Sequence, residues 1–487
     1  MPIPTTRRTK IVATLGPAWG TPEAMTELLD AGVNVVRINA SHGTPEIRDE
    51  WVGQLNELIA QRAEPAAILI DLPGPRIRVG TLEESLTLEA GQEVVFAPED
   101  EAEKGEIPTT YGALAADLNA GDTILLDDGL LAVAVSGTDG NRVRGTVRYG
   151  GLLRSNKGIN LPGVDVSASA LTEVDRREVA RVIPLGVDFI GLSFVQHPED
   201  LVELRKLVPK TVRLVAKIEK DTAVENCGAI IDAADAVMVA RGDLGVELPF
   251  ERVPLVQKEL IREAMVRGKP VITATQMLES MVQAPRPTRA ETSDVANAIL
   301  DGTDALMLSA ETAIGKYPVN AVRAMARIAR EVEGHRRGRS PAFDLAVGRR
   351  TDETERLRAH RGRDRQPTGT EDAIAVAVSA AVDLMMAPLI VCFTSSGFTA
   401  RTVAAYRPSV PVVALTPERQ TYRQLALVWG VIPVLVDHQP DYESMWLVAR
   451  QRILDLQLAR PDDRVVVTAG IPFDTPGTTN LLKVEVV

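Results

Sequence analysis

Thr211-Val-Arg-Leu-Val-Ala-Lys-Ile-Glu219 and Asp235-Ala-Val-Met-Val-Ala-Arg-Gly-Asp243 are two apolar runs that end in charged residues. Nearly continuous, β-branched runs of this length are typical of parallel strands that are covered on both faces. Six similar runs lie at residues 10–15, 33–38, 66–70, 187–192, 270–274 and 305–308. Helical patterns separate most of the eight, and Thr288-Arg-Ala-Glu291 is a capping box that opens one helix. The alternation predicts an α/β fold, a (β/α)8 TIM barrel.

The pattern changes after the third strand. Between Ile77 and Lys157 short strands alternate with turns, which predicts a small β-barrel lid domain inserted on the barrel face where active sites lie. The stretch from Arg336 to Thr370 is polar and rich in arginine, as linkers are. A further α/β unit follows it, with strands expected at 389–393, 410–415, 431–436 and 465–469. We therefore divide the chain into a barrel (1–76 and 159–336), a lid (77–158) and a carboxy-terminal α/β effector domain with the linker (337–487).

Composition excludes several classes of protein. The 487 residues carry a net charge of −12, which disfavours a nucleic-acid binder that neutralises phosphates. Two cysteines, Cys227 and Cys392, are too few for a disulfide framework or a cysteine-based zinc site. No run approaches the roughly 18 to 20 apolar residues of a membrane span, and the amino terminus lacks a signal-peptide pattern. We expect a cytoplasmic protein without nucleic-acid or membrane partners.

Polar and charged residues follow the predicted strands at the ends that would face one pocket. They are Arg37, Asn39, Ser41, Asp71, Lys217, Glu219, Asp243, Thr275, Ser309 and Glu311. Burying an isolated charge costs free energy, so charged residues at these strand ends indicate a partner or a function that compensates for the cost. Cations, carboxylates and hydroxyls in one pocket suit a metal ion that bridges an anionic substrate.

Each of these residues also has a structural interpretation. Lys217 and Glu219 lie on the same side of a strand and could form a structural ion pair. Arg37 could pair with Asp71 in the same way, and Asp243 could cap a helix after Gly242. Their convergence on one barrel face favours a catalytic anion site.

An ordered series of motifs resembles pyruvate kinase over essentially the whole chain. The motifs are Thr14-Leu-Gly-Pro17, Val36-Arg-Ile-Asn-Ala-Ser-His-Gly43, Lys157-Gly-Ile-Asn-Leu-Pro-Gly163, Lys217-Ile-Glu219, Met238-Val-Ala-Arg-Gly-Asp-Leu-Gly245, Ile272-Thr-Ala-Thr-Gln-Met-Leu-Glu-Ser-Met281, Pro285-Arg-Pro-Thr-Arg-Ala-Glu291 and Met307-Leu-Ser-Ala-Glu311. The resemblance implies transfer of the phosphoryl group of phosphoenolpyruvate to ADP, giving ATP and pyruvate. It also implies a homotetramer.

The resemblance implies a role for each matched residue. Glu219 and Asp243 would hold a divalent metal, Mg2+ or Mn2+. Lys217 would stabilise the transferring phosphoryl and the enolate oxygen, and Arg37 would hold the phosphate. Gly242, Asp243 and Thr275 would contact the substrate, Thr275 and Ser309 would serve a proton relay, and the nucleotide side would comprise Asn39, Ser41, His42, Arg78 and Lys157.

One segment departs from the family pattern. The chain reads Asp71-Leu-Pro-Gly-Pro-Arg-Ile-Arg78 where the family usually reads Asp-Thr-Lys-Gly-Pro-Glu-Ile-Arg. The segment borders a monovalent-cation site whose matching positions are Asn39, Ser41, Asp71 and Leu72. Arg76 stands in place of the glutamate and could supply the positive charge of K+, so we predict that K+ is not required. The alternative is that Arg76 turns outward to solvent at the lid hinge.

In the carboxy-terminal domain, Thr394-Ser-Ser-Gly-Phe-Thr399 resembles the effector phosphate loop of the family. Hydroxyls and a glycine turn can hold a phosphate, which implies a phosphorylated allosteric effector bound by Thr394, Ser395, Ser396, Gly397 and Thr399. Phe398 replaces a common arginine, and an ordinary strand-to-helix turn is the alternative.

Two other functions compete with the kinase. A metal-dependent lyase or aldolase acting on pyruvate-like substrates could use the same cations and carboxylates, but it would not need Lys157 and Arg78 in an inserted domain. A catalytically inactive sensor would not need Lys217, Glu219, Asp243 and Thr275.

Overall fold

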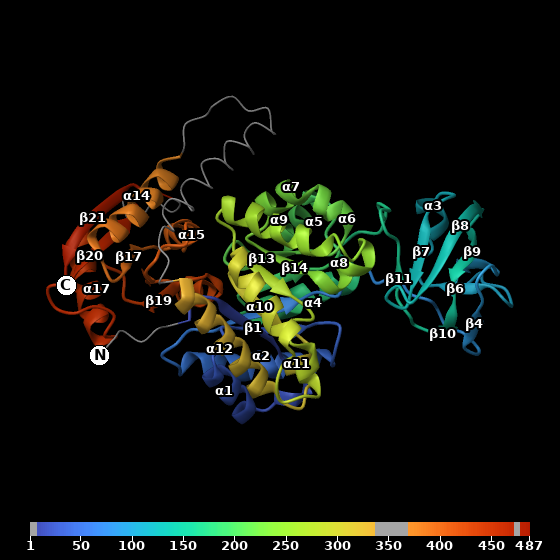
Figure 1. The fold of residues 1–487 in the computed structure, drawn as a ribbon, viewed down its shortest axis with the longest axis horizontal. Helices are drawn as coiled ribbons and strands as arrows, with labels where there is room; N and C mark the ends of the chain where they lie inside the picture. The colour runs from blue at the N-terminus through green and yellow to red at the C-terminus, as the bar shows by residue number, and fades with distance from the viewer. Residues whose placement is uncertain (1–6, 337–368, 472–477) are drawn as a thin grey trace.

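The computed structural model describes residues 7–336, 369–471 and 478–487, and the predicted linker falls almost entirely outside these ranges. Three bodies lie in a row, with the barrel between the carboxy-terminal domain and the inserted β domain (Figure 1). The predicted α/β fold with a TIM barrel, an inserted β domain and a carboxy-terminal α/β domain is confirmed. The domain limits at 76, 158 and 336 stay a prediction.

All eight predicted barrel strands are present, and they close into one parallel barrel in the order β1-β16-β15-β14-β13-β12-β3-β2. The strands are β1 (Lys10–Thr14), β2 (Val35–Asn39), β3 (Ala67–Asp71), β12 (Phe189–Leu192), β13 (Arg213–Ile218), β14 (Ala236–Ala240), β15 (Val271–Ala274) and β16 (Ala305–Leu308). Alternate residues fill the barrel interior, where Val12, Val215 and Met238 belong to one buried cluster. The other residues of each strand pack against the surrounding helices.

Helices cover the outside of the barrel. They are α1 (Pro22–Ala31), α2 (Pro45–Ala60), α4 (Glu173–Val182), α5 (Pro198–Leu207), α6 (Asp221–Glu225), α7 (Cys227–Ala233), α8 (Arg241–Glu247), α9 (Val253–Val266), α10 (Arg289–Asp301), α11 (Ala310–Ala313) and α12 (Pro318–Arg336). The predicted capping box at Thr288 and Glu291 is confirmed at the start of α10. No helix in the described ranges is long and apolar enough to cross a membrane.

The inserted domain consists of short strands around its own core, which includes Val79, Phe96 and Ile124. Its elements are β4 (Leu86–Leu88), β5 (Glu93–Pro98), β6 (Ile107–Thr109), α3 (Leu114–Asp117), β7 (Thr123–Leu126), β8 (Leu131–Asp139), β9 (Arg142–Tyr149), β10 (Gly151–Leu153) and β11 (Ile159–Asn160). Six strands form a curled sheet in the order β11-β7-β8-β9-β5-β6, and β10 pairs with β4 in a separate ladder.

The carboxy-terminal domain is a five-stranded sheet in the order β19-β18-β17-β20-β21. Its elements are α14 (Thr370–Met385), β17 (Ile390–Phe393), α15 (Phe398–Ala405), β18 (Val412–Thr416), α16 (Arg419–Gln424), β19 (Val431–Leu435), α17 (Tyr442–Asp455), β20 (Arg464–Ala469) and β21 (Leu481–Val486). The four expected strands are present, and β21 is an antiparallel edge strand that sequence analysis missed.

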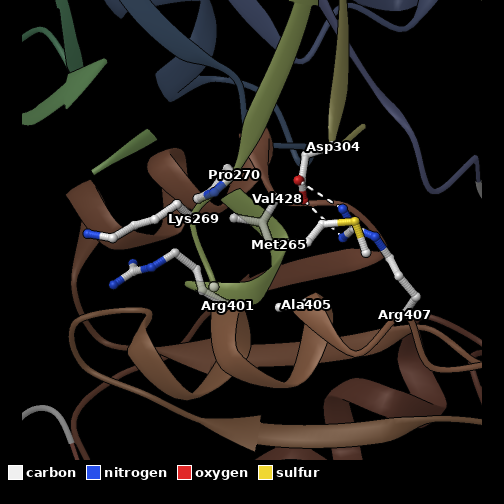
Figure 2. Close-up of a pocket in the computed structure, with 9 residues that line it drawn as sticks. Met265, Lys269, Pro270, Asp304, Arg401, Ala405, Arg407 and Val428 are labelled. Carbon is white, nitrogen blue, oxygen red and sulfur yellow. Dashed lines mark hydrogen bonds and ion pairs between the residues drawn. The ribbon is translucent and has the colours of Figure 1, made fainter. Parts of the chain in front are cut away.

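This domain closes the amino-terminal end of the barrel. Leu427 is only 1% exposed and belongs to the cluster inside the barrel. Asp304, just before β16, accepts hydrogen bonds from Arg407 (2.9 Å) and from the backbone N–H of Trp429 (3.1 Å). Figure 2 shows the Asp304–Arg407 pair at one side of a small crevice between the two domains, with Lys269 and Arg401 at the other. The crevice has room for about one water molecule.

Because Leu427 packs into the cluster inside the barrel, Leu427→Ala should leave a cavity at the amino-terminal end of the barrel. We expect a loss of about 2 to 5 kcal/mol in stability, measured as a lower urea midpoint for barrel unfolding. The matched control is Leu447→Ala, because Leu447 is 64% exposed on α17. Equal midpoints for the two variants would contradict the role of Leu427 in the barrel core.

Candidate active site

Lys217 lies at the centre of the strand ends. Its ammonium is 2.8 Å from Glu219 Oε1 and 3.2 Å from Asp71 Oδ1, and it donates to Ser193 Oγ at 2.6 Å. Ser193 directly follows β12, the strand between β3 and β13, so three neighbouring strands supply this cluster. Arg37 at the end of β2 completes it, with Nη2 2.6 Å from Asp71 Oδ2. Both ion pairs considered as structural alternatives therefore exist, and both lie within one cluster.

Electrostatics keep Lys217 and Asp71 in their charged forms. Burial would lower the pKa of Lys217, but Asp71 and Glu219 outweigh burial and hold that pKa above its ordinary value. Burial would raise the pKa of Asp71, but Lys217 and Arg37 hold it below its ordinary value. Burial raises the pKa of Glu219 to about 7, against the opposing effect of Lys217. The ammonium of Lys217 is therefore a fixed positive charge at neutral pH.

A cavity of about 390 Å³ lies above Lys217, between the barrel and the inserted domain. Its walls include six predicted site residues, which are Arg76, Arg78, Lys157, Lys217, Glu219 and Asp243. The other predicted residues at the strand ends, including Arg37, Thr275 and Ser309, are not among its walls. Carboxylates and cations thus meet in one space, with the inserted domain as its roof.

Asp243 lies on α8, whose amino end is at residue 241. The helix has Ala240 as N-cap and no side-chain capping bond, so the interpretation of Asp243 as a helix cap is wrong. Gly242 donates its backbone N–H to Thr275 Oγ1 at 2.7 Å. Thr275 has a φ of 68°, a left-handed conformation, and Arg241 Nη2 donates to its carbonyl at 2.7 Å. This contact and the ion pair of Arg241 with Asp294 (2.8 Å) hold the Thr275 hydroxyl beside Gly242.

Ser309 follows β16 and is held by Glu311. The backbone N–H groups of Ser309 (2.7 Å) and Leu278 (3.0 Å) both donate to the Glu311 carboxylate. The Ser309 hydroxyl is buried and has no hydrogen-bond partner among the described residues. A buried hydroxyl without a protein partner is a natural place for a water or a substrate group.

The predicted nucleotide-side residues lie at the junction with the inserted domain. Arg78 forms an isolated bridge with Gly158, and Lys157 pairs with Asp127 at 2.8 Å. The Ser41 backbone N–H donates to Asn39 Oδ1 at 3.0 Å. Burial, followed by the positive charges of Arg76, Arg37 and Arg78, lowers the pKa of His42.

Arg76 is exposed, as the outward-facing alternative requires, and yet it lines the cavity. No hydrogen bond or ion pair is recorded for its guanidinium within the part of the chain that the structure describes. Leu72 is 1% exposed and offers only its backbone carbonyl, which accepts the Ser193 hydroxyl at 2.7 Å. Arg76 is therefore a cation without a partner among the described residues, and position 72 offers no side-chain oxygen.

Comparison with known proteins identifies the family and the fold. The family model "Pyruvate kinase, barrel domain" matches residues 6–322, and "Pyruvate kinase, alpha/beta domain" matches residues 372–485. The pyruvate kinase of Geobacillus stearothermophilus is 42% identical over 99% of this chain and 80% of its own length. That of Clostridium acetobutylicum is 39% identical over 99% of this chain and its entire length. The crystal structure of a pyruvate kinase from Cryptosporidium parvum superposes with a TM-score of 0.90, at 32% identity, covering 99% of this chain and 96% of the other.

The chain belongs to the pyruvate kinase family. It is therefore a phosphotransferase, and membership implies a divalent metal. Among the carboxylates that line the cavity, Glu219 and Asp243 are the two that follow the barrel strands β13 and β14. Within the described ranges, no group of three or more His, Cys, Asp or Glu residues could hold a metal on its own. Two carboxylates suit a hard cation such as Mg2+, which usually keeps waters and substrate oxygens as its other ligands.

The residues that resemble the effector loop of pyruvate kinases lie far from the cavity, in the turn between β17 and α15. Thr394 Oγ1 accepts the backbone N–H of Gly397 at 2.9 Å. The hydroxyl of Ser395 is on an exposed residue, and Ser396 is half-buried. Thr399 is 3% exposed, and its hydroxyl lies 2.9 Å from that of Thr479. Ser395 is thus the most accessible hydroxyl residue of the turn, and Thr399 is the least accessible.

Sequence reasoning assigned no role to four residues that position this site, although it named Thr14 and Arg241 within motifs. Ser193 contacts Lys217, the backbone N–H of Phe194 donates to Glu219 Oε2 at 2.7 Å, and Thr14 Oγ1 accepts from Arg37 at 2.9 Å. Arg241 fixes Thr275. Ser193 follows the fourth barrel strand directly, so the rule used for the other strand ends would have found it.

Proposed function

We propose that the cavity binds phosphoenolpyruvate and ADP and transfers the phosphoryl group between them. The observation that carries the proposal is the charged ammonium of Lys217, held between Asp71 and Glu219 in a cavity that Asp243 also lines. The P–O bond to the enol oxygen breaks, a bond to a β-phosphate oxygen of ADP forms, and the enolate is left for protonation. Lys217 is placed where negative charge develops on the phosphoryl oxygens and on the enolate.

Arg37 holds the phosphate in this proposal. Its guanidinium spends three N–H groups on Asp71 and Thr14, which fixes its plane and leaves two for a ligand. Thr275 and Ser309 lie at the next strand ends and would carry a proton to the methylene carbon of the enolate. The fixed Thr275 hydroxyl and the unpartnered Ser309 hydroxyl support this role. Gly242 and Asp243 lie beside them, where the substrate carboxylate would bind.

Glu219 and Asp243 would hold the divalent metal, Mg2+ or Mn2+. When bound, the metal supplies positive charge that offsets the charge of the substrate oxygens in the transition state. Phe194 donates to Glu219 Oε2 and so orients that carboxylate. Arg78 and Lys157 line the cavity from the inserted domain and would contact the nucleotide, together with Asn39, Ser41 and His42 at the end of β2. We further propose that Arg76 replaces K+; a homotetramer and a cytoplasmic location stay predictions.

The test is pyruvate formation from phosphoenolpyruvate with ADP and Mg2+, followed by coupling to lactate dehydrogenase and NADH. We expect turnover that requires ADP and stops when the metal is chelated. Release of pyruvate without nucleotide would point to a lyase, and no turnover with intact metal binding would point to a sensor.

We also propose that residues 394–399 bind the phosphate of an allosteric effector. Ser396→Ala and Thr399→Ala should weaken the response to a phosphorylated metabolite, with kcat nearly unchanged, because the catalytic residues lie in another domain. The measurement is the substrate curve at increasing concentrations of sugar phosphates and nucleoside monophosphates. Thr402→Ala is the control, because Thr402 lies on α15, outside the turn, and its hydroxyl donates to Phe398 O of the same helix at 3.1 Å. A screen in which none of these metabolites shifts the wild-type curve would refute the effector proposal.

A further inference from the structure

One face of β13 connects the two ends of the barrel. Side chains alternate along a strand, so Arg213, Val215 and Lys217 share the interior face, and Val215 belongs to the interior cluster. Arg213 lies at the amino-terminal end, at the contact with the carboxy-terminal domain, and Lys217 lies in the active-site cavity. The two are about 13 Å apart along the strand. A shift at the start of β13 therefore acts on the strand that carries Lys217 and precedes Glu219.

The guanidinium of Arg213 holds three acceptors from two domains. It donates to Asp235 Oδ1 (3.0 Å) in the barrel, and to Gln424 Oε1 (3.3 Å) and Ser396 O (3.2 Å) in the carboxy-terminal domain. Asp235 in turn accepts the backbone N–H of Leu214 at 2.9 Å, so Arg213 and the strand backbone share one carboxylate. Asp235 directly precedes β14, which leads to Asp243.

Ser396 O belongs to a peptide group that faces two ways. Its carbonyl accepts from Arg213 and also from Arg401 Nη1 at 3.1 Å, whereas its N–H, on Gly397, donates to Thr394 Oγ1. The C=O and N–H of one trans peptide point in opposite directions. An anion that draws the N–H and the hydroxyls of the turn toward itself must therefore rotate the carbonyl away from the two arginines. Gly397, with a φ of 76°, gives the peptide this freedom.

Arg401 reinforces the contact from the carboxy-terminal side. In Figure 2 its side chain extends in the same direction as that of Lys269, away from the Asp304–Arg407 pair. The structure records no ion pair for Arg401 among the described residues, and Ser396 O is its hydrogen-bond acceptor. Burial lowers the pKa of Arg401 to about 10. The Ser396 carbonyl thus accepts hydrogen bonds from two guanidinium groups, and its rotation would remove an acceptor from both.

We infer that Arg213 is a positioning residue through which the conformation of the 394–399 turn reaches Lys217 and Glu219. The inference rests on the proposed phosphate site at this turn for its physiological trigger, but not for the contact itself. With the Ser396 carbonyl in place, three acceptors hold Arg213 and the start of β13. When the peptide between Ser396 and Gly397 rotates, Arg213 loses the Ser396 carbonyl and keeps Asp235 and Gln424 of the three acceptors. The start of β13 can then change its position. The result is a change in substrate affinity rather than in the chemical step.

The first test compares Arg213→Met with Arg205→Met. Arg205 on α5 pairs with the same carboxylate, Asp235 Oδ2 at 2.6 Å, but its other acceptors are Pro209 O and Val212 O, inside the barrel. We expect Arg213→Met to change the KM for phosphoenolpyruvate at least fivefold with kcat within twofold, and Arg205→Met to leave KM within twofold. Arg213→Lys should restore the wild-type KM only in part, because an ammonium cannot reach three acceptors as a guanidinium does. Equal KM values for the two methionine variants would overturn the inference.

The second test needs no effector. Gly397→Ala perturbs the turn, because its Cβ would lie 3.0 Å from Arg401 Nη1 and 3.2 Å from Leu425 at a positive φ. Gly430→Ala is the control for backbone strain, since Gly430 has a φ of 68° and nothing within 4 Å of its Cβ. We expect Gly397→Ala to shift the KM for phosphoenolpyruvate in the wild-type background and to have no further effect with Arg213→Met. Additive effects, or no shift in the wild type, would overturn the inference.

The two proposals fail in different ways. If no metabolite shifts the substrate curve but Gly397→Ala and Arg213→Met are non-additive, the turn has no phosphate effector and the connection through Arg213 stands. If a metabolite shifts the curve equally in wild type and Arg213→Met, the effector site stands and the connection is wrong. If a metabolite binds to the Arg213→Met variant without shifting the substrate curve of that variant, both the effector site and the connection through Arg213 stand. Calorimetry with glucose 6-phosphate and AMP measures that binding.

Discussion

Lys217→Met is expected to lower kcat by about 10³-fold or more. Methionine keeps much of the apolar stem but deletes the ammonium that faces the transferring phosphoryl, and single electrostatic stabilisers are often worth roughly 10² to 10³ in rate. The structure explains why no neighbour can substitute for it. Arg37, the other cation of the cluster, is fixed on Asp71 and Thr14 and cannot move to the position of the Lys217 ammonium. The measurement is steady-state kcat in the coupled assay at saturating substrates and metal.

Loss of Lys217 also leaves Asp71 and Glu219 without a shared cation, which could destabilise the fold. Two measurements separate this effect from catalysis: thermal unfolding, and binding of Mn2+ detected by electron paramagnetic resonance. Because Glu219 and Asp243 remain in the variant, metal binding should largely survive. Lys206→Met is the control, since Lys206 is an exposed lysine on α5. A kcat within tenfold of wild type in a folded, metal-binding Lys217→Met protein would refute the assigned role.

The second expected result is turnover without potassium. Arg76 lines the cavity with a permanent positive charge and no partner among the described residues, and it lies four positions after Leu72 of the predicted monovalent-cation site. Two unit charges ~4 Å apart repel by about 1 kcal/mol in water and about 4 kcal/mol at an effective dielectric of 20, so a K+ ion beside this guanidinium is disfavoured. We expect activity in tetramethylammonium or sodium buffer to rise less than twofold on adding KCl at matched ionic strength. Activation of tenfold or more would defeat the prediction.

Arg76→Glu should reverse this behaviour. The carboxylate replaces a positive charge by a negative charge at position 76. Activity should therefore fall without K+ and recover by tenfold or more when K+ is added. Arg154→Glu is the matched control, because it makes the same charge change at an exposed position of the inserted domain. If neither variant responds to K+, Arg76 does not occupy the role of the ion.

The barrel could be predicted almost strand for strand, because each strand is a short apolar run that can be recognised in the local sequence. The run at 211–218 is apolar, β-branched and bounded by polar residues, and the structure has β13 at Arg213–Ile218. The same local signal failed for β21, whose residues Leu481–Val486 are half-buried or exposed and pair antiparallel at a sheet edge. Its apolar residues Leu482, Val484 and Val486 alternate with Lys483 and Glu485, as in a strand covered on one face, and a search for continuous apolar runs does not detect such a strand.

The sequence by itself determined which residues could meet at the active site. Parallel strands with covered faces place their carboxyl ends together, so Arg37, Asp71, Lys217 and Asp243 had to approach one another once a barrel formed. Only the tertiary structure decided how they pair. Lys217 contacts Asp71 across β12 because the barrel closes in the order β13-β12-β3, and Ser193 enters because it follows the strand between them. The contact of Arg213 with the Ser396 carbonyl has the same origin. It depends on the docking of two domains, and no local pattern in either segment encodes the partner that the other supplies.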